Sequence, residues 1–135
     1  MRIIEFRAQQ INGHWVYGNY THLRKDFSSV RKGHYISNSA GSPFAFMVRP
    51  ETVCLSTNAY DQKNNLIFEG DILKHETEGL FTIIWDKDFL GFAAKSEGSN
   101  AVDSIHLPYL KKCKIVGNIY QNPKLLEVVS SKNKA

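Results

Sequence analysis

Short apolar runs separated by turn-forming residues are the feature that most limits what this chain can fold into. Runs rich in β-branched and aromatic residues, such as 3–8, 44–48 and 113–120, alternate with segments that contain glycine, asparagine, aspartate or proline. That pattern is typical of strands joined by tight connections. No apolar run approaches the roughly 20 residues that a membrane-spanning helix needs. The pattern therefore predicts a mainly β fold and no membrane partner.

Two hairpins can be located from their turn residues. Asn12 and Gly13 separate the strand-like runs 3–8 and 14–20, and both residue types tolerate the positive φ that a tight hairpin requires. The runs 79–86 and 89–95 read as a second hairpin with residues 86–88 at its tip. Both hairpins predict antiparallel pairing between consecutive strands.

Three other segments carry weaker signals. Segment 21–30 places apolar residues at i, i+4 and i+7, as in a helix, but its neighbours suit a hairpin equally well, so both structures remain open. Segment 104–110 reads as a strand. Segment 122–129 begins with asparagine and proline, which are typical of a helix start, and predicts a short C-terminal helical turn.

The length of 135 residues suits one domain, and a chain of this length can bury a core without disulfides or metals. The apolar fraction of 42% and the charged fraction of 22% are ordinary for a globular protein. We expect a single domain over 1–135, with two packed β subdomains of about 1–49 and 50–127 as the alternative. The polar end, 128–135, is expected to be a flexible tail.

Cysteine content and the N-terminus point to a reducing compartment. The first ten residues lack the apolar core of an export signal, because Glu5 and Arg7 interrupt it. The two cysteines, Cys54 and Cys113, are then expected to be free thiols. These features predict a cytoplasmic protein.

Glu69, Gly70 and Asp71 interrupt an otherwise apolar stretch in NNLIFEGDILK, residues 64–74. Glycine can take the backbone angles of a turn or bulge, and aspartate can accept hydrogen bonds from N–H groups that the turn leaves unpaired. We interpret Gly70 and Asp71 as a structural turn between two strands. Such an entry, followed by a glycine-containing turn and another apolar strand, is common in SH3-like barrels.

The chain also resembles the YopX family of bacteriophage and prophage proteins. The family pattern P-E-T-V…D-K-N-G-K-x-I-Y-E-G-D-I-V is similar to residues 50–74, and E-V-I-G-N-I-Y-E-N-P-E-L-L is similar to residues 114–127. The matched positions in the first segment are Pro50, Glu51, Thr52, Val53, Asp61, Asn64, Ile67, Glu69, Gly70, Asp71 and Ile72. The resemblance implies a small, mainly β, YopX-like fold with an SH3-like barrel portion, in the cytoplasm of a bacterial host. It implies no activity.

Candidate catalytic and metal sites have structural alternatives that we favour. Acidic residues could hold Mg²⁺ if they converged, and a hydrolase centred on Asp71 is the least favoured hypothesis; the acidic set is Glu69, Asp71, Glu76, Glu78, Asp86 and Asp88. Cys113 and His106 could form a nucleophile and base, but no motif surrounds them. The cysteines and histidines lack zinc-ligand spacing. We predict no catalytic residue, no metal and no cofactor.

Basic clusters are the strongest candidates for a binding surface. The net charge is +4, with excess positive charge in residues 1–35 and 101–135 and excess negative charge in 36–100. The candidate nucleic-acid contacts are Arg24, Lys25, Arg31, Lys32, Lys111, Lys112 and Lys114. Neighbouring aromatic residues could stack on bases beside such charges.

These observations lead to three hypotheses. The first is a non-catalytic module that binds a protein or nucleic acid of host or phage, and the second is a nucleic-acid-binding SH3-like barrel. The third is the metal-dependent hydrolase. Self-association through exposed strand edges remains a further expectation.

Overall fold

The structure is a computed structural model that describes residues 4–38, 45–96 and 102–125. It is mainly β, with eleven strands in two antiparallel sheets and only short helical turns in the described ranges. The expected mainly β class is therefore confirmed. The chain divides into two compact units, residues 1–56 and 57–135, and each unit has its own cluster of buried apolar residues. The expected flexible tail, 128–135, lies outside the described residues.

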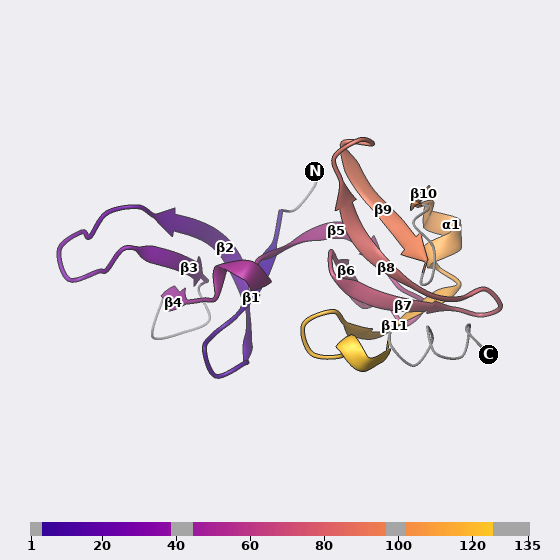
Figure 1. The fold of residues 1–135 in the computed structure, drawn as a ribbon, viewed down its shortest axis with the longest axis horizontal. Helices are drawn as coiled ribbons and strands as arrows, with labels where there is room; N and C mark the ends of the chain where they lie inside the picture. Colours follow the sequence, from indigo (N-terminus) through magenta and orange to yellow (C-terminus); the bar gives the residue numbers. More distant parts are fainter. Residues whose placement is uncertain (1–3, 39–44, 97–101, 126–135) are drawn as a thin grey trace. The chain divides into compact units, whose positions relative to one another are not determined.

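The first unit is built from hairpins. Its elements are β1 (Phe6–Gln9), β2 (Trp15–Leu23), β3 (Gly33–Ser37), β4 (Ala45–Met47), the 3₁₀ turn η1 (Pro50–Thr52) and the start of β5 (Cys54–Tyr60) (Figure 1). β1 pairs with β2 across the predicted turn, where Gly13 has a φ of 88°. β2 continues to Leu23 and pairs with β3, so segment 21–30 is a hairpin and not a helix. Ala8, Ile36 and Val48 form the buried core of this unit.

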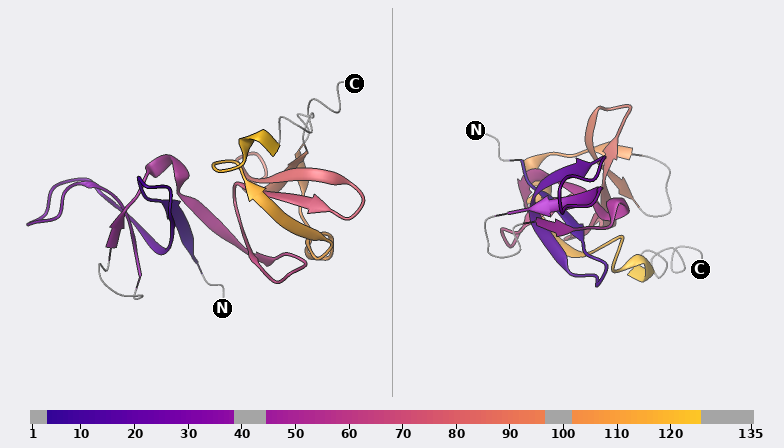
Figure 2. Two further views of the ribbon diagram at one scale, coloured as in Figure 1. Left: turned by 90° about the horizontal axis from the view of Figure 1, so that it is seen from below. Right: turned by 90° about the vertical axis from the view of Figure 1, so that its left-hand side faces the viewer.

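The second unit holds the five-stranded sheet. Its remaining elements are β6 (Leu66–Phe68), β7 (Asp71–His75), β8 (Gly79–Asp86), β9 (Gly91–Ser96), β10 (Val102–Ser104), α1 (Leu107–Leu110) and β11 (Cys113–Asn118). The strand order is β10-β9-β8-β7-β11, and β11 lies beside β7 in both figures (Figures 1 and 2). Ile67, Leu73 and Ile83 are fully buried in its core.

The SH3-like barrel portion that we expected is an open sheet in the part of the chain that the structure describes. The edge strands of the five-stranded sheet are β10 and β11, and each has one neighbour. The other sheet runs β4-β3-β2-β1-β5-β6 and is also open over the described ranges. No closed barrel is therefore present among these residues.

One predicted strand is wrong. Segment 104–110 contributes only Ser104 to β10, and residues 107–110 form the helical turn α1. Pro108 lies in the first turn, where its missing N–H removes no helical hydrogen bond. Leu110 then enters the core at 3% exposure. Pro108 thus lies in the first turn of a helix and not in a strand.

The predicted C-terminal turn falls at the edge of the described residues. Residues 123–125 are helical, and Leu125 N donates to the Asn122 carbonyl. The Asn122 side chain bonds to the end of β11, where its Oδ1 accepts a hydrogen bond from Asn118 N at 3.2 Å. Residues 126–129 lie outside the described ranges. In the described residues, no helix has the length and apolar character needed to cross a membrane.

Candidate functional site

The β2–β3 hairpin carries four of the predicted basic residues on one projecting segment, which we call the arm (residues 22–34) (Figure 1). At its tip Phe27 and Val30 form an isolated β-bridge, with Phe27 N donating to Val30 O and Val30 N donating to Phe27 O, both at 2.8 Å. Ser28 completes the turn with a φ of 53°. The tip is thus a closed two-residue turn, and it presents the Phe27 ring to solvent at 73% exposure.

The arm is strongly basic for its length. Arg24, Lys25, Arg31 and Lys32 are all exposed, and Asp26 is the one carboxylate among residues 22–34. Asp26 Oδ1 accepts from Lys32 N at 2.8 Å, so this carboxylate helps to hold the turn. The arm therefore offers four cations beside an exposed aromatic ring.

Aromatic side chains at the base of the arm stack on one another. The rings of His22 and His34 lie with their centroids 4.0 Å apart, and the Tyr20 hydroxyl lies 2.6 Å from His34 Nδ1. Desolvation, followed by the positive charges of His34 and Arg24, lowers the pKa of His22. The base of the arm thus favours the uncharged form of His22.

The other predicted basic residues belong to the second unit. Lys111 and Lys112 lie between α1 and β11, and Lys114 lies in β11; all three are exposed. Lys112 and Lys114 line a hollow of about 250 Å³, together with Gln62, Lys74, His75 and Glu76. The sequence did not single out Lys74 or His75, because only the β7–β11 pairing brings them beside the predicted lysines.

The Gly70–Asp71 turn lies between β6 and β7. Gly70 has a φ of 88°, its N–H donates to Ile83 O at 2.7 Å, and its carbonyl accepts from Ile119 N at 2.9 Å. Asp71 is 1% exposed, and its Oδ2 accepts from Phe68 N at 2.8 Å. The Asp71 carboxylate thus stabilises the turn that precedes β7.

We predict that Gly70→Val lowers the free energy of unfolding by about 1–3 kcal/mol, because valine is strained at positive φ. Urea denaturation measures the change. Gly79→Ala, at a comparable φ of 89° and with open space around the added Cβ, measures what this backbone angle costs a residue other than glycine. A Gly70→Val transition that coincides with the parent's would contradict the role of this turn.

Three other residues of the acidic set accept hydrogen bonds from nearby groups. Glu78 Oε2 accepts from the Tyr109 hydroxyl at 2.8 Å, and Glu76 Oε1 accepts from Gln62 Nε2 at 3.0 Å. Asp86 Oδ1 accepts from two backbone N–H groups in the β8–β9 turn. Within the described ranges, no three histidine, cysteine, aspartate or glutamate residues form a group that could hold a metal ion.

The cysteine–histidine alternative places its two residues in different environments. Cys113 is fully buried, and its thiol lies 3.3 Å from the Tyr109 carbonyl as a donor. Burial, with smaller contributions from Glu78, Glu76 and Asp61, raises the pKa of Cys113 to about 11. His106 is an exposed residue that precedes α1. Cys113 thus has the character of a protonated core thiol, and Cys54 is likewise buried, with its thiol donating to the Thr52 carbonyl at 3.2 Å.

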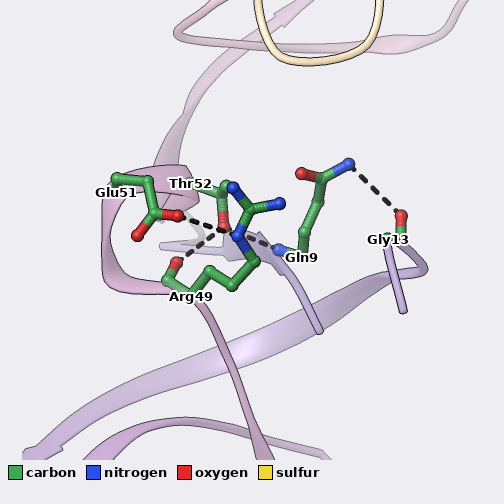
Figure 3. Close-up of polar contacts among 5 residues, drawn as sticks. All are labelled: Gln9, Gly13, Arg49, Glu51 and Thr52. Atoms are coloured by element: carbon green, nitrogen blue, oxygen red, sulfur yellow. Dashed lines mark hydrogen bonds and ion pairs between the residues drawn. The ribbon is translucent and has the colours of Figure 1, made fainter. Parts of the chain in front are cut away.

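The P-E-T-V segment has a structural role in the first unit (Figure 3). Thr52 is 1% exposed, and its hydroxyl both accepts from Gln9 N at 2.8 Å and donates to Arg49 O at 2.7 Å. The same segment places the exposed Arg49 and Glu51 side chains in an ion pair of 2.8 Å. The turn η1 is thereby attached to β1.

Asp61 joins the two matched segments, because it lies in 50–74 and accepts a hydrogen bond from a residue of 114–127. Asp61 is 1% exposed; its Oδ1 accepts from Lys63 N and Asn65 N, and its Oδ2 accepts from Ile115 N at 3.0 Å. Burial raises the pKa of Asp61, but these backbone donors outweigh burial, so the pKa is lowered. The carboxylate joins the 61–65 turn to β11.

The G-N-I-Y-Q-N-P segment is closely packed at the end of β11. A Cβ at Gly117 would lie 2.5 Å from Asn122 Oδ1, so this position has no room for a larger residue unless Asn122 moves. Asn118 Oδ1 accepts from Tyr120 N and Gln121 N, both at 3.0 Å. The Thr52, Asp61 and Asn118 side chains of the two matched segments thus all stabilise turns.

The fold and these turns define a class: a small, mainly β protein with two sheets and buried polar side chains at its connections. The chain belongs to the YopX family, whose model, described as YopX protein, matches residues 5–127. The family resemblance seen in the sequence is therefore confirmed.

One solved structure supports the same fold. The crystal structure of protein EF1440 from Enterococcus faecalis is similar to this chain, with a TM-score of 0.55 and 23% sequence identity. The alignment covers 92% of this chain and 98% of that chain. At this identity the likeness shows the fold alone. No curated protein matches the chain.

Proposed function

We propose that this chain is a non-catalytic macromolecule-binding module that contacts its partner through the arm. One observation carries the proposal: a closed hairpin tip presents Phe27 to solvent, with Arg24 and Lys25 on one side of the hairpin and Arg31 and Lys32 on the other. Exposed aromatic and arginine side chains are the residue types that most often dominate binding energy at interfaces. The family relationship supports a phage or prophage accessory role in the bacterial cytoplasm.

The local roles of the acidic residues favour binding over catalysis. A hydrolase centred on Asp71 would need that carboxylate to face a metal or substrate, but Asp71 is buried and accepts from Phe68 N. The Cys113 thiol is buried, and its raised pKa disfavours the thiolate that acts as a nucleophile. Neither alternative offers a group poised for chemistry.

Nucleic acid is the second candidate partner. Four cations beside an exposed aromatic ring combine phosphate attraction with a surface for base stacking. The hypothesis of a nucleic-acid-binding SH3-like barrel also includes Lys111, Lys112 and Lys114. These lysines lie in the second unit, whose five-stranded sheet is open over the described residues. Their contribution to binding would therefore be separate from that of the arm.

A pull-down from infected cells tests the arm. We expect the tagged chain to retain a partner that is lost when Arg24, Lys25, Phe27, Arg31 and Lys32 are all changed to alanine. The matched control changes four exposed lysines (Lys63, Lys87, Lys95 and Lys124) and the exposed Phe89 to alanine, and it should retain the partner. If the partner is lost with both variants, or is retained by both, the arm is not the binding surface. A protein partner should survive nuclease treatment, whereas a nucleic-acid partner should not.

A further inference from the structure

A hollow in the second unit gathers positive charge that the described residues leave uncompensated. Lys74, Lys112 and Lys114 line it with Gln62, His75 and Glu76. None of the three lysine side chains makes an ion pair or hydrogen bond with the residues that the structure describes. Three ammonium groups and one carboxylate leave the lining with a charge of +2 when His75 is neutral.

The sheet register places two of these cations directly opposite each other. Lys74 in β7 and Lys114 in β11 are paired across the antiparallel ladder, and both are exposed. Directly opposed residues have Cβ atoms about 4.5–5.5 Å apart, and like charges at such positions destabilise a sheet. A bound anion would turn this repulsion into attraction.

The other lining residues leave donors available. Glu76 Oε1 accepts from Gln62 Nε2 at 3.0 Å, so one oxygen of the only lining carboxylate already has a partner. His75 Nδ1 accepts from Thr77 N at 3.1 Å and from Glu78 N at 3.3 Å, which places the proton of the neutral ring on Nε2. Stacking on Tyr109, with the centroids 4.4 Å apart, holds the ring in position. Nε2–H is thus a further donor in the lining.

We propose that this hollow is a phosphate-binding site. A phosphate group offers several acceptor oxygens and carries enough charge to engage more than one lysine at once. The volume of about 250 Å³ exceeds that of a few water molecules at about 30 Å³ each, so it also admits the carbon group attached to a phosphate ester. The ligand is therefore inorganic phosphate, a phosphomonoester or the phosphodiester backbone of a nucleic acid. This site lies in the second unit and does not depend on the arm.

A titration followed by amide NMR shifts tests the site. Inorganic phosphate, added at constant ionic strength against chloride, should produce saturable shifts at residues 62, 74–76 and 112–114. The double variant Lys74→Gln/Lys114→Gln should weaken binding at least tenfold. The control Lys87→Gln/Lys95→Gln removes the same charge from exposed positions outside the hollow and should leave the affinity unchanged. Unsaturable shifts, or equal weakening by both variants, would overturn the proposal.

A second readout separates binding from a structural effect. In chloride buffer, Lys74→Gln should raise Tm, because it removes one member of the like-charged pair. Added phosphate should then raise the Tm of the parent more than that of the variant. The site would be contradicted if the Tm of the variant in chloride were no higher than that of the parent. It would also be contradicted if phosphate raised the Tm of the variant as much as that of the parent.

The source of the phosphate is decided by parallel titrations with thymidine monophosphate and a short oligothymidylate at one salt concentration. Shifts at the same residues with tighter binding of the oligonucleotide would identify a nucleic-acid backbone. Tighter binding of the monophosphate would identify a small phosphomonoester. Shifts outside the hollow with all three ligands would overturn the proposed location.

Discussion

Asp61→Asn should lower the free energy of unfolding by about 2–4 kcal/mol. The carboxylate is 1% exposed and accepts three backbone hydrogen bonds, from Lys63, Asn65 and Ile115. An asparagine side chain has one acceptor oxygen, so its NH₂ group must face an N–H donor. Hydrogen bonds to a charged group contribute about 1.5–3 kcal/mol, and an unsatisfied buried donor costs about 1–3 kcal/mol. Urea denaturation followed by Trp85 fluorescence in a Trp15→Phe background measures the change.

The exposed Asp88 supplies the control for this prediction. Asp88→Asn makes the same change in charge at an exposed position, and it should leave the denaturation midpoint unchanged. If Asp61→Asn behaves like this control, the carboxylate does not hold the 61–65 turn to β11.

The effect of Asp61→Asn should also depend on pH. The folded-state pKa of Asp61 is lowered, so its stabilising contribution is complete above the unfolded-state pKa of about 4. The contribution is lost as pH falls through the folded-state pKa, where the native carboxylate takes up a proton. The difference in stability between parent and variant should therefore shrink in acid. A difference that stays constant from pH 7 to pH 2 would show that the charge is not its cause.

Gly18→Ala is the second substitution with a large expected effect. Gly18 lies in β2 with a φ of 154°, and an added Cβ would overlap the Ser37 carbonyl oxygen, which is a backbone atom. Backbone strain and overpacking each cost about 1–3 kcal/mol. Relief would require β2 and β3 to separate at the base of the arm. We expect a loss of about 2–4 kcal/mol, measured by Trp15 fluorescence in a Trp85→Phe background.

Gly91→Ala is the matching control, because the added Cβ meets only the Phe89 carbonyl oxygen at 4.0 Å. It should change stability by less than about 1 kcal/mol. If both alanine variants unfold at the parent's midpoint, the contact between Gly18 and β3 is not a close one.

Much of the strand pattern could be predicted from local sequence. The Asn12–Gly13 turn and the 79–95 hairpin were confirmed, because turn residues and alternating apolar runs act over a few neighbouring positions. The strand predicted for segment 104–110 was wrong, and the reason lies in its proline. Pro108 is compatible with either a strand end or a helix start, and the burial of Leu110 accompanies the helical turn.

The candidate sites also differ in how far the local sequence predicts them. Arg24, Lys25, Arg31 and Lys32 are close in sequence, so a single hairpin carries them all. The phosphate site could be predicted only in part, because Lys74 and Lys114 are 40 positions apart in the numbering and meet through strand register. A shift of one residue would move one of them to the other face of the sheet.

The sequence by itself determined the mainly β class, the family and most turns, because glycine, proline, asparagine and aspartate act on the backbone where they stand. The tertiary structure alone decided that the five-stranded sheet stays open over the described residues and that Asp61 serves β11. It also decided which lysines share a hollow. These features depend on hydrogen bonds between distant segments, which local composition does not specify.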